Sequence, residues 1–237
     1  MTMLCARVRN HGGPENLLLE QTDVPQPSAG EVRVRLKAAA LNHLDLWVRK
    51  GVPGHQFPLP LIPGCDGAGI VEAVGPGVSD QQIGTEVVLA PGISCGECDR
   101  CLAGNDMLCA GYGILGETRD GTCAEAIIVP QAQLLPRPEG ISWNESAAFC
   151  LSALTAWSML QKAQLETGET LLVIAGASGV GTMAIQMGVL LGARVIATGS
   201  TKAKRELALQ LGASNSVVST DETWWRSVKE LTEGAGA

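Results

Sequence analysis

The stretch 170–199, TLLVIAGASGVGTMAIQMGVLLGARVIATG, decides the fold of the C-terminal part of this chain. Its first apolar run predicts a buried strand over 170–176, and a helix is expected over 178–193 after a glycine-rich turn. A second strand is predicted over 193–199. Glycines seated between a strand and a helix are typical of sites where a dinucleotide pyrophosphate meets a helix N-terminus. The stretch therefore predicts a nucleotide-binding strand–turn–helix unit.

The glycine-rich turn supplies the first candidate cofactor contacts. The dinucleotide pattern requires glycine where the strand turns, a small residue beside the pyrophosphate, and glycine where helix and strand meet. The residues that occupy this turn are Gly176, Ser178, Gly179, Val180 and Gly181. The alternative is a tight turn that only lets the helix pack closely on the strand.

The end of the second predicted strand discriminates between NAD and NADP. An NAD site usually has an acidic residue here to bind the ribose hydroxyls. This chain has Gly199 instead, followed by Ser200 and Lys204, whose hydroxyl and ammonium groups suit a 2′-phosphate. The pattern favours NADP(H) over NAD. The alternative is that the basic residues at 202–205 are a solvated helix start.

The remaining pattern predicts two domains. Downstream, a helix over 201–213, a strand over 214–218 and a helix that starts at Asp221 extend the strand–helix alternation, which implies a parallel sheet. Upstream, residues 1–145 contain alternating or apolar strands that indicate an irregular β-barrel; they are expected over 31–41, 69–75, 85–90 and 124–130. Ser142 and Glu145 stand at capping-box spacing before a helix over 142–163. The predicted fold class is α/β plus β, with the second domain over 146–237.

Composition narrows the class of partners. The formal net charge is −7, and no basic run offers a phosphate-binding stripe, so neither nucleic acid nor an anionic membrane is an expected partner. We find no signal-peptide pattern at the N-terminus and no apolar run long enough to span a bilayer. Four of the eight cysteines are scattered among apolar residues, so reduced thiols and a cytoplasmic location are expected.

The other four cysteines form a cluster with metal-ligand spacing. Cys95, Cys98, Cys101 and Cys109 follow the pattern C-x2-C-x2-C-x7-C. Four thiolates complete a tetrahedral zinc site and leave no open position, which predicts a structural Zn²⁺ rather than a reactive one. An iron–sulfur cluster is the main rival, although Ala110 stands where ferredoxin-like runs have proline. Unmetallated thiols are the other alternative.

Taken together, these motifs resemble the zinc-containing medium-chain alcohol dehydrogenase and quinone oxidoreductase superfamily. The resemblance is carried by PSAGEVRVRLKAAALNHLDLW, LPLIPGCDGAGIVEAVGPGV, the four-cysteine segment, SALTAW and the glycine-rich turn, across almost the whole chain. It implies a GroES-like catalytic domain over 1–145 with a zinc lobe at 91–112, then a Rossmann domain. It also implies a homo-oligomer and NADPH-dependent hydride transfer to a small molecule: a quinone, an activated alkene or a carbonyl compound.

The resemblance also assigns three ligand positions to a reactive zinc. In the alcohol dehydrogenases these hold Cys, His, and Cys or an acid; here they correspond to Asn42, Cys65 and Leu151. Because Asn is a poor zinc ligand and Leu is none, we expect no reactive zinc here. An irregular site that combines Cys65 with His43, Asp66 or Cys150 is the alternative.

Without that metal, charge on the substrate must be stabilised by hydrogen bonds. Asn42, His43 and Asp45 are the candidate catalytic residues because they occupy the corresponding active-site turn. His43 is a candidate proton donor, and Asp45 is expected to bind its own backbone or Arg49.

Three strands and three helices make up only the first half of a Rossmann domain, so the chain is expected to be the N-terminal part of a longer oxidoreductase. Two other hypotheses remain: a zinc-dependent alcohol dehydrogenase, and an inactive fragment that acts as a binding module.

Overall fold

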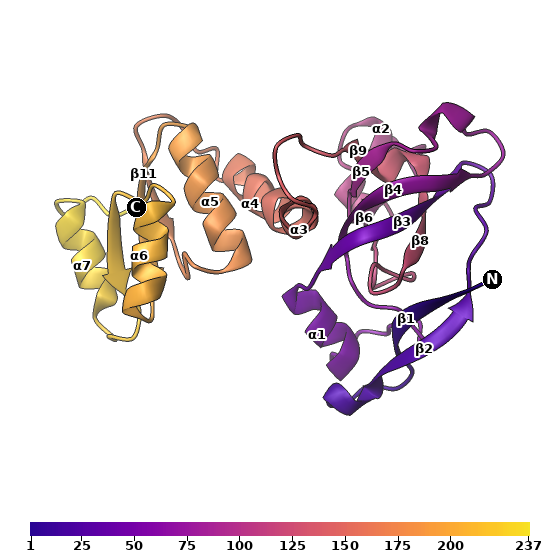
Figure 1. Cartoon of the computed structure of the whole chain (residues 1–237). Coiled ribbons are helices and arrows are strands. Elements are labelled where there is room, and N and C mark those ends of the chain that lie inside the picture. The colour runs from indigo at the N-terminus through magenta and orange to yellow at the C-terminus, as the bar shows by residue number, and fades with distance from the viewer. The chain divides into compact units, whose positions relative to one another are not determined.

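The computed structural model describes residues 1–237 and divides into two compact units, Met1–Leu151 and Ser152–Ala237 (Figure 1). The predicted domain boundary lies six residues earlier, between 145 and 146. No helix is both long and apolar enough to cross a membrane.

The first unit is built mainly from strands and short helices. Its strands are β1 (Thr2–Val8), β2 (Leu17–Asp23), β3 (Glu31–Ala40), β4 (Asp66–Val74), β5 (Glu86–Leu89), β6 (Gly92–Ile93), β7 (Gly113–Ile114), β8 (Ala126–Pro130) and β9 (Leu134–Pro136). Its helices are α1 (His43–Lys50), α2 (Asp99–Leu102) and α3 (Trp143–Ala148), with 3-10 turns η1 (Pro14–Asn16), η2 (Asp80–Gln82), η3 (Asp106–Leu108) and η4 (Gln131–Gln133).

Five strands form the central sheet of this unit, in the order β8-β3-β4-β5-β9. The alternation predicted for 31–41 is confirmed at the start of β3, because Val32 and Val34 are fully buried whereas Glu31 and Arg33 are half-buried and Arg35 is exposed. They pack in one core with Val71 of β4 and Leu89 of β5. The opposite face carries Ala68 and receives α3.

The predicted barrel is not closed by a continuous hydrogen-bond ladder. β1 and β2 form a separate antiparallel hairpin. Only isolated bridges join β1 to the rest of the unit, at Cys5–Ala124 and Val8–Leu61. The four strands predicted over 31–41, 69–75, 85–90 and 124–130 are present as β3, β4, β5 and β8, whereas the hydrogen bonding in the unit is that of several sheets.

The helix predicted over 142–163 is broken at Phe149. The Ser142 capping box is present as predicted, since the Ser142 hydroxyl accepts from Glu145 N and the Glu145 carboxylate accepts from Ser142 N. α3 ends at Ala148, and α4 (Cys150–Lys162) then begins. The N–H of Leu151, which a continuous helix would direct to residue 147, donates to the carboxylate of Asp66 at 2.8 Å. A buried side chain from β4 thus interrupts the helix.

The second unit contains a three-stranded parallel sheet in the order β10-β11-β12, as predicted. Its elements are β10 (Thr170–Val173), α5 (Gly179–Leu190), β11 (Arg194–Gly199), α6 (Lys202–Gln210), β12 (Asn215–Val218) and α7 (Trp224–Leu231).

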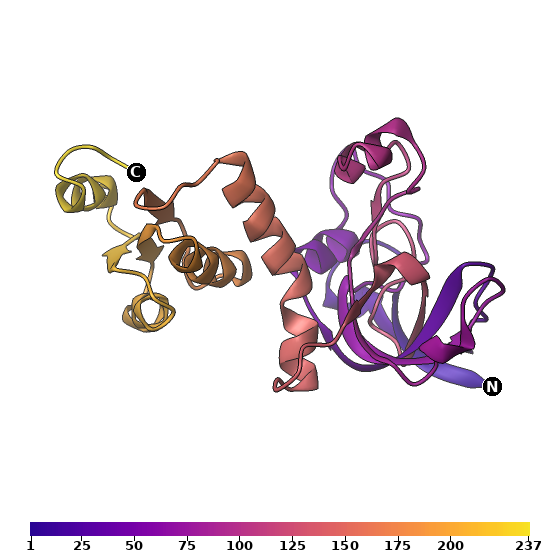
Figure 2. The ribbon, with the colours of Figure 1, turned by 90° about the horizontal axis from the view of Figure 1, so that it is seen from above.

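Successive residues of β11 face opposite layers of this unit. Val195 and Ala197 pack with Ile185 of α5 and Ala208 of α6, whereas Ile196 packs with Val228 of α7. Figure 2 shows the yellow α7 and the orange α6 on opposite sides of the strands. This is the layering of a doubly wound α/β sheet.

Helix α7 begins at Trp224 rather than at the predicted Asp221. Asp221 Oδ1 accepts hydrogen bonds from the N–H and the hydroxyl of Thr223, at 2.7 and 2.8 Å. The aspartate therefore closes a turn one step before the helix instead of capping it.

Candidate functional site

The glycine-rich turn connects β10 to α5 with very little space around it. A Cβ atom added to Gly181 would lie 2.4 Å from the carbonyl oxygen of Ala175, and one added to Gly176 would lie 2.9 Å from Ala197 Cβ. Gly181 therefore allows the helix to start against the turn, and Gly176 allows the turn to pack on β11. These are the two spatial roles that the sequence pattern predicts for glycine.

Ser178 and Thr198 fix the shape of this turn. The Ser178 hydroxyl accepts the N–H of Gly181 at 3.1 Å and so caps α5. Buried Thr198 accepts Ala175 N on its hydroxyl at 3.0 Å, and its carbonyl accepts Gly176 N. Ala175 itself has a φ of 56°. The Ser178 hydroxyl thus lies at the N-terminus of α5, and a helix N-terminus is a position that suits phosphate.

A cavity of about 160 Å³ adjoins the turn and brings together four of the predicted cofactor residues, Ser178, Gly199, Ser200 and Lys204. Its lining consists of Ala175, Ala177, Ser178, Thr198, Gly199, Ser200, Lys204 and Ser219. Lys204 Nζ donates to Ser200 Oγ at 3.3 Å, while Lys202 pairs with Glu206 at 3.6 Å on the outside of α6. No carboxylate lines this cavity, so its charged group is the Lys204 ammonium.

Four of the predicted cofactor residues do not line this cavity: Gly176, Gly179, Val180 and Gly181. Val180 lines a different cavity, of about 330 Å³, between α4, β10 and α5. Gly179 faces Ser152, whose hydroxyl would lie 2.8 Å from an added Cβ. Gly179 and Val180 belong to the first turn of α5, so a cofactor would meet their backbone rather than their side chains.

The four clustered cysteines lie in a lobe whose base is the β6–β7 pair. Their sulfur atoms all lie within 4.8 Å of one another, with Sγ–Sγ distances of 3.5 Å for Cys98–Cys101 and Cys95–Cys109 and 3.8 Å for Cys95–Cys101. Four thiolates about 2.3 Å from one tetrahedral zinc ion are about 3.8 Å apart. The cluster fits a single ion better than several iron atoms.

Backbone N–H groups around the lobe favour thiolate sulfur. Gly111 N donates to Cys109 Sγ at 3.3 Å. Hydrogen bonds from the backbone of Glu97 and Cys98, and from neighbouring thiols, lower the pKa of Cys95 to about 6. Thiolate is the form that binds a metal, so the loop is preorganised for one.

The turn before α1 is held by Asp45. Its carboxylate accepts Asn42 N at 2.7 Å on one oxygen and Gly64 N at 2.8 Å on the other. The prediction that Asp45 binds local backbone is confirmed, whereas Arg49 instead donates to the carbonyl of Gly12. Burial raises the pKa of Asp45, although the two N–H donors oppose this. Asp45 ties α1 to the segment that precedes β4.

The side chain of Asn42 lies between Cys65 and Asp66. Its Nδ2 donates to Cys65 Sγ at 3.3 Å and to Asp66 Oδ2 at 2.8 Å. The second oxygen of Asp66 accepts Leu151 N. Burial raises the pKa of Asp66. Burial also raises the pKa of the Cys65 thiol well above its usual range, and the nearby carboxylates of Asp45 and Asp66 raise it further. We call Asn42, Cys65 and Asp66 the Asn42 network.

The structure therefore brings together the three positions that the resemblance assigns to a reactive zinc. Asn42 contacts Cys65, and the partly buried Leu151 packs against the core cluster that contains Cys65. These side chains do not fit the metal, because only Cys65 among the three offers a zinc ligand atom. Cys150 is buried with Ala68 and Val88, as expected of a small apolar side chain.

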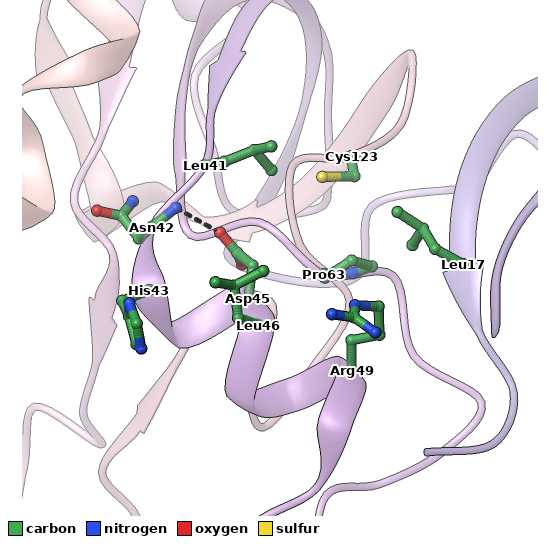
Figure 3. Close-up of a pocket in the computed structure, with 9 residues that line it drawn as sticks. All are labelled: Leu17, Leu41, Asn42, His43, Asp45, Leu46, Arg49, Pro63 and Cys123. Atoms are coloured by element: carbon green, nitrogen blue, oxygen red, sulfur yellow. Dashed lines mark hydrogen bonds between the residues drawn. The ribbon is translucent and has the colours of Figure 1, made fainter. Parts of the chain in front are cut away.

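His43 is the exposed member of the predicted catalytic group. It is the first residue of α1, and its ring meets Trp47 edge-on at a centroid distance of 5.0 Å. A mostly apolar cavity of about 310 Å³ lies beside the helix; its lining consists of Leu17, Leu41, Asn42, His43, Asp45, Leu46, Arg49, Pro63 and Cys123. In Figure 3 the His43 ring and the Arg49 guanidinium project from different sides of α1.

Sequence reasoning missed the hydrogen-bonding roles of two residues that organise these sites. Asp66 is the acceptor that joins Asn42 to Leu151, and Thr198 holds the glycine-rich turn. Asp66 could have been found from the sequence, because an acidic residue within an otherwise apolar segment such as GCDGAGI indicates a buried carboxylate with hydrogen-bond partners. No local pattern distinguishes Thr198 from an ordinary strand residue.

Comparison with known proteins gives matches to both units. The family model of the alcohol dehydrogenase GroES-like domain matches residues 28–139, and that of the zinc-binding dehydrogenases matches 179–237. A zinc-type alcohol dehydrogenase-like protein of Schizosaccharomyces pombe is 36% identical over 94% of this chain and 64% of its own length. A quinone oxidoreductase of Pseudomonas aeruginosa is 33% identical over 94% of this chain and 61% of its own.

A solved structure described as an NAD-dependent alcohol dehydrogenase superposes with a TM-score of 0.95 at 51% identity, and the match covers 99% of this chain and 69% of that one. The chain spans less than two thirds of the length of the curated relatives that it matches. On these matches, and on the strand–turn–helix unit and GroES-like domain described above, the chain belongs to the zinc-containing medium-chain alcohol dehydrogenase and quinone oxidoreductase superfamily.

Proposed function

We propose that this chain is the part of an oxidoreductase that carries its catalytic domain and the adenosine side of its nicotinamide cofactor, with NADP(H) preferred over NAD(H). The observation that carries the proposal is the cavity beside the glycine-rich turn. It combines a helix N-terminus with the Ser200 hydroxyl and the Lys204 ammonium, and no carboxylate opposes a 2′-phosphate.

The names of the relatives differ in the cofactor and substrate that they give, so they do not select one for this chain. The solved structure at 51% identity is named as NAD-dependent, and the P. aeruginosa relative is named a quinone oxidoreductase. The preference for NADP(H) therefore rests on the residues of this cavity alone. Quinones, activated alkenes and carbonyl compounds are the proposed substrate class, because the active-site turn lacks two of the three ligand side chains of a reactive zinc.

The proposed reaction requires a hydride and a proton. When bound, the nicotinamide supplies the hydride to the electrophilic carbon of the substrate. The proton goes to the substrate oxygen that gains negative charge, and we assign its donation to His43, whose imidazole is exposed at the start of α1. Asn42 and Asp45 are assigned positioning roles, since their hydrogen bonds fix the turn that presents His43.

The four-cysteine cluster is proposed to hold a structural Zn²⁺. It supplies no open coordination position, so its contribution is to fold the lobe. A homo-oligomeric state and a cytoplasmic location stay predictions.

Nucleotide titration tests the cofactor proposal. Wild-type chain should bind NADPH more tightly than NADH, followed by nucleotide fluorescence. Lys204→Ala should weaken NADPH binding about tenfold to a hundredfold, as expected for a charge-assisted hydrogen bond to phosphate, and should leave NADH binding nearly unchanged. Lys202→Ala is the matched control, because Lys202 pairs with Glu206 away from the cavity. Tighter binding of NADH by the wild type, or equal effects of the two lysine variants, would contradict the NADP(H) preference.

A further inference from the structure

The Asn42 network is the second place in this chain where side chains suited to metals gather. Cys65 and Asp66 are both fully buried, and buried Asp45 approaches the same turn. A thiol and two carboxylates are common zinc ligands, and buried anionic groups need compensation of some kind. Here hydrogen bonds from N–H groups supply that compensation to the thiol and to both carboxylates.

Each ligand atom of the Asn42 network faces an N–H donor. Cys65 Sγ and Asp66 Oδ2 both accept from Asn42 Nδ2, and Asp66 Oδ1 accepts from Leu151 N. The two oxygens of Asp45 accept from Asn42 N and Gly64 N in the same way. The Asn42 amide nitrogen lies within hydrogen-bond distance of both Cys65 Sγ and Asp66 Oδ2, so it stands where a cation shared by these two atoms would bind, and its hydrogens carry partial positive charge.

The orientation of the Asn42 amide is fixed by its partners. If the amide were turned over, its oxygen would lie where the nitrogen now is, 2.8 Å from a carboxylate oxygen of Asp66. Two acceptors at that distance repel each other, so the nitrogen faces Asp66 and Cys65. An amide nitrogen that uses its hydrogens in this way has no lone pair for a metal. At the third position, the side chain of Leu151 offers no ligand atom.

We infer that the Asn42 network stands in place of the reactive zinc of this superfamily, so that the chain holds a single zinc ion, bound by Cys95, Cys98, Cys101 and Cys109. The consequence of this inference for catalysis rests on the proposed function. The number of bound zinc ions, however, can be measured without turnover and does not depend on cofactor preference.

Metal counting on three forms of the chain tests the inference. Wild type, Cys65→Ser and Cys98→Ser are purified with zinc present, freed of loose metal by gel filtration and measured by plasma mass spectrometry. We expect one zinc per chain in the wild type, the same in Cys65→Ser, and loss of most of the zinc in Cys98→Ser. Two zinc ions in the wild type, or loss of zinc in Cys65→Ser, would overturn the inference.

If Cys98→Ser fails to fold, X-ray absorption at the zinc edge of the wild-type protein provides a second test, because it identifies the atoms that surround the bound zinc. Four sulfur neighbours at about 2.3 Å are the expected result. A mixed shell with nitrogen or oxygen neighbours would show that part of the zinc lies outside the four cysteines and would also overturn the inference. Because neither measurement uses NADPH or a substrate, failure of the proposed function would leave both results interpretable.

Discussion

The zinc lobe and the Asn42 network lie in the same unit and both contain side chains that can bind a metal, yet the geometry of the two is opposite. In the lobe, four sulfurs face one another within 4.8 Å, and backbone N–H groups approach from outside. In the Asn42 network, the thiol and the carboxylate face N–H donors instead of one another. The difference teaches that metal-competent residues make a metal site only where their lone pairs converge on a common point.

The largest expected effect comes from breaking the lobe. Cys98→Ser removes one of four convergent thiolates, so we expect loss of zinc and, because a structural metal stabilises the loop that holds it, a loss of about 4 kcal/mol or more in the free energy of unfolding. Urea unfolding and limited proteolysis within 91–112 measure it. Unchanged stability with the zinc lost would show that the lobe folds without its metal.

The next expected effect is a gained zinc. The triple variant Asn42→Cys, Cys65→His, Leu151→Cys places at these three positions the ligands that the alcohol dehydrogenases use, and it removes the amide donor. We expect the zinc content to rise from one to two per chain, because Asn42 already contacts Cys65 and Leu151 packs nearby. A count that stays at one in a folded triple variant would mean that the backbone, and not only the side chains, has departed from the ligand geometry.

A smaller effect is expected from removing the donor alone. Asn42→Ala leaves Cys65 Sγ and Asp66 Oδ2 without their side-chain partner, and a buried acceptor that loses its donor costs about 1–3 kcal/mol. Thermal or urea unfolding measures the change. Asn105→Ala is the matched control, since Asn105 Nδ2 makes only a long, exposed bond to the Ala103 carbonyl at 3.4 Å. Equal destabilisation by the two variants would remove the structural role given to Asn42.

The smallest expected effect is a dependence on pH. Burial raises the pKa of Asp66 in the folded state above its unfolded value, so the folded protein holds this proton more tightly. The stability that Asp66 contributes, relative to a non-titrating Asp66→Asn variant, should be greatest below the unfolded pKa and should be lost as the pH rises through the folded pKa. Unfolding free energies of both proteins across the acidic range give this difference. A difference that grows with pH would show that the hydrogen bonds to Asp66 outweigh its burial.

Local patterns predicted much of this molecule because the local interactions are the ones that the structure uses. The Ser142 capping box, the alternation in 31–41 and the glycine-rich turn each depend on residues a few positions apart. The parallel order β10-β11-β12 follows from the strand–helix alternation in the same way.

The features that sequence reasoning could not reach depend on contacts between distant segments. The break at Phe149 arises because Leu151 N donates to Asp66, which is distant in sequence. The open hydrogen bonding around β1 depends on which strands meet across the unit. Asn42 was recognised as a poor zinc ligand, but its role as the donor to Cys65 and Asp66 became visible only in the structure.

The measurement that tests the central claim most directly is a crystal structure of the zinc-loaded chain with anomalous scattering recorded at the zinc edge. The account predicts one anomalous peak, surrounded by the sulfurs of the lobe cysteines Cys95, Cys98, Cys101 and Cys109, and none beside Cys65. A second peak within bonding distance of Cys65 Sγ would contradict the account, because it would place a reactive metal where the structure has the Asn42 network.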